Sequence, residues 1–221
     1  MFHRETPRLC IALGLLALGL LSAGCANQRA WPSGFLNHNA ELQATGHGDD
    51  VAYVRPGINW KNYRYAYIEP ARVRPATPGA VDATAEQQAE LTAYLHQATA
   101  EAFCDRFILV NKPVRDAVRI RTAITEVGQA NPWVNIPAAI IAYPVDYGGV
   151  TVEMEILDAT TGHRLCALMA SRTGNPLQLA EHFNWLGHAR RGVDRCAERL
   201  RLTINESAAH PPTQRALACA P

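Results

Sequence analysis

The side chains best suited to catalysis or metal binding are scattered along this sequence. His182 and His188 lie six residues apart, which at about 100° per residue puts them on nearly opposite faces of a helix. Glu153 and Glu155 share one face of an expected strand, where two neighbouring like charges favour exposure to solvent. The sequence carries no nucleophile elbow, phosphate loop, dinucleotide fingerprint or HExxH zinc motif. These patterns predict that the protein is not an enzyme and holds neither a metal nor a cofactor.

Arginines recur every fourth residue on the last expected helix, at Arg191, Arg195 and Arg199. Asp194 and Glu198 lie beside them, so the pattern favours a solvated face with salt bridges that contribute about 0.2–0.5 kcal/mol each. The alternative is a face that contacts anionic lipid headgroups or a cell-wall polymer.

Cys25 is suited to a different chemistry, the covalent attachment of lipid. Arg4 and Arg8 precede an apolar run over residues 11–21, and small residues lead from this run to the cysteine. This order is typical of a secretory signal peptide, and the run is too short to span about 30 Å of hydrocarbon. The segment resembles a bacterial lipobox, in which the cysteine is lipidated and becomes the new N-terminus. An ordinary signal peptide with an incidental cysteine is the alternative.

We therefore expect a signal peptide over residues 1–24 and a lipid anchor, including palmitate, on Cys25. Several acyl chains anchor a protein stably, because each buried CH2 group contributes about 0.8 kcal/mol. Ala26 follows the cysteine instead of aspartate, which in a bacterium with two membranes implies the outer membrane. The expected location is the outer membrane, with the chain bound through its N-terminal lipid and facing the periplasm.

Export would place the other cysteines in an oxidising compartment, where disulfides persist. Their spacing fits no zinc pattern, because such patterns need close pairs. Four cysteines allow three pairings, among which the sequence does not choose. We expect one or two structural disulfides, with buried free thiols as the alternative. The cysteines concerned are Cys104, Cys166, Cys196 and Cys219.

The charge balance argues against one class of partner. The full chain has 21 Lys and Arg residues against 20 Asp and Glu residues, and the signal peptide contains Arg4, Arg8 and Glu5. The chain beyond it is therefore neutral, whereas nucleic-acid binding needs a basic excess. We expect no nucleic acid as a partner.

The chain beyond the signal peptide divides into three parts. Residues 25–62 contain glycines and prolines without a sustained period, which predicts a lipidated N-terminus, a tether and an arm. Residues 63–205 alternate between strand and helix patterns and predict one domain, and residues 206–221 predict a loose C-terminal tail. Large apolar side chains of the arm are expected to pack onto the domain, namely Trp31, Phe35, Leu36 and Trp60.

The patterns within the domain predict the order β-α-β-β-β-β-α. Thr84 and Gln87 form a capping box at the start of a helix over 81–104, and the last helix opens at 175–176 with an apolar stripe that reaches Ile204. We expect an α+β fold, a two-layer sandwich whose mostly antiparallel sheet of about five strands packs against the two helices. The first helix connects two parallel neighbouring strands. Strand patterns cover 63–73, with an edge or bulge at Pro70, and 107–110, 118–124, 150–156 and 164–172.

The segment 132–145 is almost entirely apolar, although it lies between two strands where a short turn is usual. The simplest interpretation is a flap over the sheet. The alternatives are an interface with an envelope protein or a second copy of the chain, and a loop that dips into the membrane. As a contact surface it would present Trp133, Ile136, Ile140, Ile141 and Tyr143.

Several short motifs, in their order along the chain, resemble a known family. They are Ser33–Leu36, Tyr53–Trp60, Arg121–Glu126, Ala130–Pro132 and Leu157–Gly162. Together they look like the bacterial lipoprotein family catalogued as domain of unknown function 3313, with the resemblance spanning about residues 31–205. After Leu36 the chain has Asn37-His38-Asn39 where the family tends toward an acidic-aromatic pair. The family has no established function, so the resemblance implies no catalytic residues.

These expectations combine into one functional hypothesis. The chain is expected to be an outer-membrane-anchored lipoprotein of unknown molecular function, acting as a non-catalytic envelope accessory or binding module. Its partners would be the membrane, through the lipid, and either an envelope protein or a second copy of the chain. The alternative is a hydrolase or transferase that acts on an envelope polymer or lipid.

Overall fold

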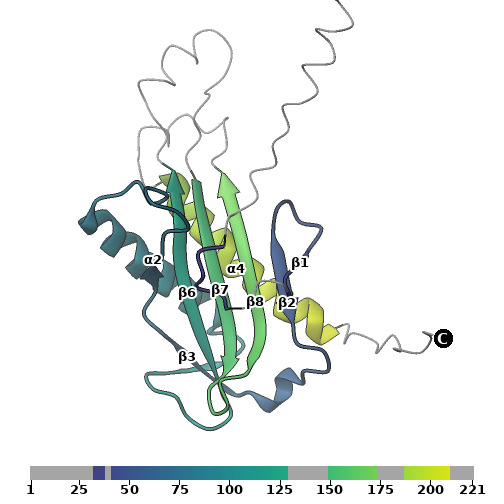
Figure 1. The fold of residues 1–221 in the computed structure, drawn as a ribbon. Coiled ribbons are helices and arrows are strands. Elements are labelled where there is room, and N and C mark those ends of the chain that lie inside the picture. The colour runs from purple at the N-terminus through teal and green to yellow at the C-terminus, as the bar shows by residue number, and fades with distance from the viewer. Residues whose placement is uncertain (1–31, 38–40, 129–148, 174–186, 210–221) are drawn as a thin grey trace, which may run out of the picture.

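The computed structural model describes residues 32–37, 41–128, 149–173 and 187–209 (Figure 1). Several expectations fall outside these ranges: the signal peptide, the lipid anchor at Cys25, any disulfide of Cys219, the site of His182, the apolar segment 132–145, the opening of the last helix at 175–176, and the expected tail beyond Ala209. The proposed contact residues Trp133, Ile136, Ile140, Ile141 and Tyr143 therefore remain predictions.

One mixed sheet carries the fold, in the order β1-β2-β8-β7-β6-β3-β5, with β4 paired to β6. The pairs from β1 to β6 along this order are antiparallel, whereas β3 runs parallel to both β5 and β6. The strands are β1 (Gln43–Ala44), β2 (Val51–Val54), β3 (Tyr65–Ile68), β4 (Arg72–Val73), β5 (Ile108–Val110), β6 (Ala117–Gly128), β7 (Gly149–Asp158) and β8 (Arg164–Thr173).

The α+β class is confirmed, but the sheet has eight strands where about five were expected. Two of the additional strands, β1 and β2, come from the segment interpreted as a tether and arm. They are two and four residues long, too short for a period of two to stand out. The expected strand over 63–73 is also two strands, because Pro70, which lacks an N–H donor, lies between β3 and β4.

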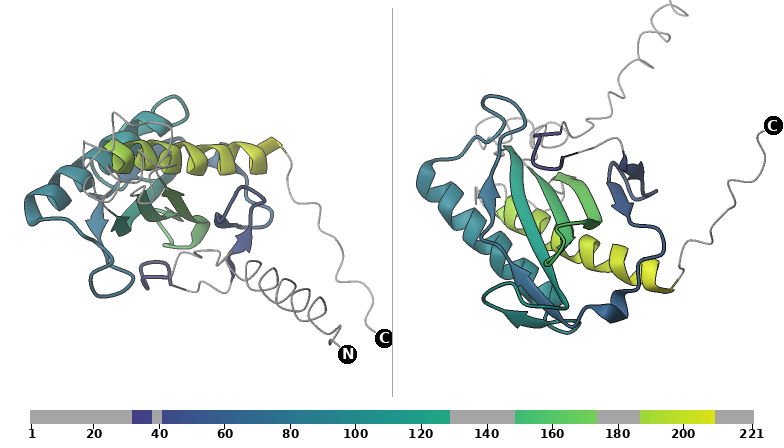
Figure 2. Two further views of the ribbon diagram at one scale, coloured as in Figure 1. Left: turned by 90° about the horizontal axis from the view of Figure 1, so that it is seen from above. Right: turned by 60° about the horizontal axis from the view of Figure 1, so that its bottom comes forward.

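Both long helices cover the same face of the sheet (Figure 2). Helix α2 (Ala85–Phe103) begins with the expected capping box, in which the Thr84 hydroxyl accepts from the Gln87 N–H and the Gln87 side chain accepts from the Thr84 N–H. Helix α4 (Gly187–Ala209) contributes the apolar side chains expected from its stripe, among them the buried Val193, Leu200 and Ile204. Between the helices and the sheet lies the main hydrophobic core.

The opposite surface of the sheet, which we call the helix-free face, is buried at its centre. Along β7, Val152 and Met154 point into the main core, so Glu153 and Glu155 point to the helix-free face. Their exposed fractions are 0% and 3%. The expectation that these two acids are exposed is therefore wrong, because the N-terminal residues Ser33 and Leu36 bind Glu153, and Arg121 and Arg164 pair with Glu155.

The short 3-10 helix η2 (Trp60–Asn62) joins β2 to β3 and places Trp60 in the main core. Phe35 and Leu36 are also buried, so the expected packing of these three residues onto the domain is confirmed, while Trp31 lies outside the described residues. Among the described residues, none of the helices combines the length and apolar character that a membrane span requires.

Candidate functional site

The most enclosed polar group of the helix-free face is the carboxylate of Glu153. The backbone N–H of Ser33 donates to Oε1 at 2.7 Å, and the backbone N–H of Leu36 donates to Oε2 at 3.0 Å. Gly34 lies between the two donors with φ of +79°, a conformation that glycine adopts without strain. The turn Ser33–Leu36 thus directs two backbone donors at one carboxylate, in the manner of an anion-binding nest.

Apolar contacts complete the attachment of this turn. Phe35 and Leu36 pack with Ala123, Ala167 and Met169 in a second, smaller hydrophobic cluster. In the strand register, Glu153 pairs with Ala123 on β6 and with Met169 on β8. The small side chain of Ala123 next to the carboxylate leaves space for the turn to approach the sheet.

A row of alternating charges extends from this cluster across the helix-free face. The Arg121 guanidinium forms an ion pair with Glu155 and lies 3.6 Å from Glu69, measured from Nε to Oε2. On the other side, Glu155 accepts from Arg164 at 3.2 Å. Arg121 also lies 5.0 Å above the Phe35 ring, a cation–π contact. Each acid in this row has an arginine partner, so the row joins the Ser33–Leu36 turn to three strands.

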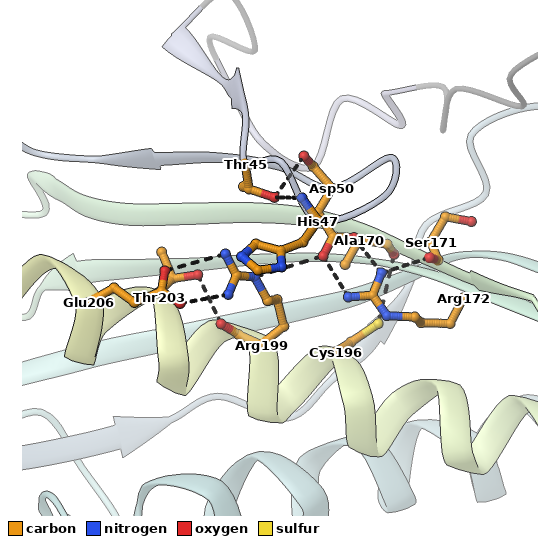
Figure 3. Close-up of polar contacts among 10 residues, drawn as sticks. All are labelled: Thr45, His47, Asp50, Ala170, Ser171, Arg172, Cys196, Arg199, Thr203 and Glu206. Carbon is orange, nitrogen blue, oxygen red and sulfur yellow. Dashed lines mark hydrogen bonds and ion pairs between the residues drawn. The ribbon is translucent and has the colours of Figure 1, made fainter.

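A second buried carboxylate, Asp50, ties strand β2 to helix α4 (Figure 3). Asp50 has no exposed surface and forms a two-pronged ion pair with Arg172 of β8, in which Nη2 lies 2.5 Å from Oδ2. Hydrogen bonding to Asp50 raises the pKa of the Arg172 guanidinium. Arg199 of α4 approaches from the other side, with its Nε 3.9 Å from Asp50 Oδ2 and its Nη1 3.0 Å from Glu206.

This arrangement corrects the expectation for the arginine-rich face of the last helix. Arg199 is buried with 7% of its surface exposed, whereas Arg195 is exposed as expected. The repeat of four did not reveal this difference, because helix α4 has β2 beside it only near its C-terminal half, where Asp50 meets Arg199.

The three described cysteines form no disulfide. Cys166 and Cys196 are enclosed in the main core, while Cys104 is exposed at the end of α2. The expected disulfides among these three are therefore wrong, and the alternative of buried free thiols applies to Cys166 and Cys196. Burial raises the pKa of each of these two thiols to about 12. Cys196 donates weakly to the carbonyl of Ala170 at 3.8 Å.

These contacts hold segments that are distant in the chain against one another. Each carboxylate oxygen of Glu153 and Asp50 accepts a hydrogen bond from the chain itself, and the described residues contain no grouping of His, Cys, Asp and Glu that could hold a metal ion. Ser33–Leu36 and Glu153 stand out separately in the sequence, whereas Asp50 and Arg172 do not. No local pattern connects these partners, because they lie more than a hundred residues apart in the chain.

A comparison with curated proteins found no match to this chain. A comparison with solved structures found similar chains. A PelC dodecamer from Paraburkholderia phytofirmans is similar at 11% identity, over 69% of this chain and 96% of that one, with a TM-score of 0.42. Protein XCC0632 from Xanthomonas campestris is similar at 12% identity over 71% and 94%, also with a TM-score of 0.42. A candidate lipoprotein from Caulobacter crescentus CB15 is similar at 14% identity over 54% and 80%, with a TM-score of 0.28.

The family comparison covers most of the chain and includes both attachment points. The matched region, residues 32–200, begins one residue before Ser33 and contains Asp50, Glu153, Arg172 and Arg199. Over these residues the chain matches the family described as "Protein of unknown function (DUF3313)", and it belongs to that family.

Proposed function

We propose that this protein is a lipoprotein of the bacterial outer membrane that serves as a non-catalytic envelope accessory or binding module. The observation that carries the proposal is the attachment of the Ser33–Leu36 turn to Glu153, so soon after the lipobox cysteine. A domain attached by its first residues to its own sheet is held close to any lipid on Cys25.

Chain geometry limits how far the domain can lie from the bilayer. Eight residue steps separate Cys25 from Ser33, and fully extended chain covers at most about 3.3–3.6 Å per residue. The turn on the helix-free face would therefore lie within roughly 30 Å of the lipid-bearing cysteine. This is much closer than a tether through residue 62 would require, so the domain would meet partners at the membrane surface.

The two buried acids, Glu153 and Asp50, already accept hydrogen bonds from the chain itself, which supports a non-catalytic role. A general acid or base needs a carboxylate with access to substrate. Glu153 and Asp50 are instead fully buried and occupied by donors from the chain. An envelope hydrolase or transferase would have to use other residues.

Lipid attachment can be tested with a single substitution. The wild-type chain should incorporate labelled palmitate and fractionate with the outer membrane, whereas Cys25→Ser should incorporate none and be released. Cys104→Ser, which removes an exposed cysteine, is the matched control and should behave as wild type. A Cys25→Ser protein that stayed on the membrane would contradict the lipid anchor.

The apolar segment 132–145 is the proposed contact surface for a partner or a second copy. The double variant Ile140→Ser/Ile141→Ser should reduce crosslinking of the lipidated protein in native membranes while its unfolding midpoint stays unchanged. If the variant unfolds instead, the segment is a flap over the domain. Capture of only abundant lipoproteins by wild type would argue against a dedicated partner.

A further inference from the structure

A hollow of about 730 Å³ opens at the end of the sheet where β3 and β5 begin. Its walls come from the junction of η2 with β3 and from the connection between α2 and β5. Three of the lining side chains are basic, Lys61, Arg64 and Arg106, and the volume falls in the range of small-ligand sites, about 300–1,000 Å³.

The positive charge of this hollow is only partly compensated within the described part of the chain. Lys61, Arg64 and Arg106 form no ion pair with any described residue, in contrast to the arginines of the helix-free face. The acid in the lining, Asp105, lies 3.7 Å from Arg201, but Arg201 already forms a two-pronged ion pair with Glu198. Asp105 therefore offsets one of the three positive charges of the lining, and about two remain for a ligand.

Arg106 is held in position before any ligand arrives. Its guanidinium carbon lies 5.9 Å from the Trp60 ring and 5.5 Å from the Phe107 ring, and Nη1 donates to Asn205 at 2.9 Å. Its Nε is buried without a hydrogen-bond partner among the described residues. A cation already held by aromatic rings and by Asn205 binds an anion, through guanidinium nitrogens other than the buried Nε, at a smaller entropy cost than a free side chain.

From these contacts we propose that the hollow binds a phosphomonoester group, with Arg106 as the fixed anchor and Lys61 and Arg64 as its mobile partners. A phosphomonoester carries about −1.5 to −2 charges at pH 7 and matches the excess charge, whereas a carboxylate carries only −1. The planar guanidinium also matches phosphate oxygens in a two-pronged contact.

The apolar part of the lining suggests what carries the phosphate. Ile108 is 54% exposed and Leu109 is 39% exposed, and both line the hollow beside the basic residues. These side chains would contact a glycerol, sugar or acyl portion attached to the phosphate. The source is either a phosphomonoester lipid or a soluble phosphorylated compound. The inference goes beyond the proposed function and does not depend on lipid attachment at Cys25.

The test uses residues 25–221 carrying Cys25→Ser, the chain expected after removal of the signal peptide, so that neither the lipid anchor nor the apolar run 11–21 binds vesicles. Glycerol 3-phosphate is titrated by calorimetry, with glycerol as the neutral probe, and flotation is measured with phosphatidylcholine vesicles with and without phosphatidic acid. We expect saturable binding of glycerol 3-phosphate, of phosphatidic acid vesicles, or of both. The pattern identifies the source as soluble, as lipid, or as either.

Two matched double variants separate a site from general attraction. Lys61→Gln/Arg64→Gln should weaken binding roughly tenfold or more, because it removes two charged hydrogen-bond donors from the phosphate site. Lys112→Gln/Arg115→Gln removes the same charge from exposed residues outside the hollow and should change affinity less than about twofold. Absence of binding to both probes, or equal losses in the two variants, would overturn the proposal.

Arg106→Lys provides a further check, because it keeps the charge and removes the planar contact. It should weaken binding while the unfolding transition remains cooperative. Wild-type affinity in this variant would contradict the role of Arg106 as the anchor.

Discussion

Glu153 on the central strand β7 accepts a hydrogen bond of 3.0 Å from the backbone N–H of Leu36, which lies 117 residues earlier in the chain. A carboxylate with no exposed surface is costly to bury unless donors replace its lost water. Here two backbone N–H groups replace it, and both come from the turn Ser33–Leu36. The burial of this charge and the position of the turn therefore depend on each other.

Glu153→Gln should detach this turn from the sheet. The amide offers one acceptor and places an NH2 group opposite a backbone N–H, so one donor of the turn loses its partner. An unsatisfied buried group costs about 1–3 kcal/mol, and we expect a loss of that size in the free energy of unfolding in urea. Amide exchange at residues 33–36 should become faster at the same time.

Glu101→Gln is the control for this change, because Glu101 is exposed on α2 and makes a local hydrogen bond with Gln97. Its effect should stay within about 0.5 kcal/mol. Equal losses in the two variants, or unchanged exchange at 33–36 in Glu153→Gln, would show that the hydrogen bonds from Ser33 and Leu36 do not hold the turn.

Asp50→Asn should destabilise the protein more than the neighbouring Asp49→Asn. Asp50 is fully buried between Arg172 and Arg199, and its neutralisation leaves both cations without this partner. Removal of one partner from a buried pair costs about 3–5 kcal/mol, but Arg172 keeps 19% of its side chain exposed, so we expect about 2–4 kcal/mol. Asp49 is exposed, and its change should be nearly neutral.

Urea unfolding of the two variants measures this difference, and amide exchange of Val51–Val54 reports whether β2 separates from β8. A loss confined to stability, with β2 still protected, would mean that strand pairing alone holds this edge of the sheet. Similar effects of the two substitutions would remove the proposed role of Asp50.

The parts of the fold that the sequence predicts are those with long regular patterns or local chemistry. The capping box at Thr84 needs only four consecutive residues, and the stripe of α4 repeats over several turns. The hairpin of β7 and β8 is likewise marked by strict alternation around Asp158, which accepts from the Thr160 and Thr161 N–H groups in the turn.

The parts that the sequence does not predict depend on partners distant in the chain. Alternation places Glu153 on one face of β7 but does not say that residues 33–36 cover that face. In the same way, Arg199 is indistinguishable in sequence from its exposed neighbour Arg195, since only the position of Asp50 separates them. The spacing of the cysteines did not predict the free thiols for the same reason, because it does not say which thiols lie close together in the fold.

The buried thiols should make the protein progressively less stable in alkali. Burial raises the pKa of Cys166 and Cys196 from 9.0 to about 12, so between these values the unfolded chain loses two protons that the native chain keeps. The unfolding free energy is therefore fully maintained below pH 9 and falls as pH rises toward 12, by up to about 1.4 kcal/mol per pH unit for each thiol.

Urea unfolding at pH 8, 9 and 10 tests this slope. Tyr63 contributes to the decline only from its ordinary pKa of 10.0 upward, where the unfolded chain begins to lose a proton that the native chain keeps, because burial and its hydrogen bond to Asp158 raise its native pKa to about 12. Most of the window lies below that value. Cys166→Ala/Cys196→Ala should flatten the decline, at the cost of lower stability at every pH. Cys104→Ala should leave the slope unchanged, because that thiol is exposed in the native chain. An unchanged slope in the double variant would contradict burial of the two thiols.

Gly192→Ala tests how closely helix α4 packs on the sheet. A Cβ atom at this position would overlap with Val150 Cγ1 and lie 3.4 Å from Arg172 Cβ. Alanine favours a helix by about 1 kcal/mol over glycine, whereas overpacking of a tight core costs about 1–3 kcal/mol. Because Val150 is buried and its branched side chain has few rotamers, we expect the packing cost to exceed the gain and the unfolding free energy to fall.

In a Val150→Ala background, which opens space at this contact, Gly192→Ala should lose its penalty and become neutral or stabilising. A stabilising effect of Gly192→Ala in the wild-type background would instead mean that α4 lies farther from β7 than these distances indicate.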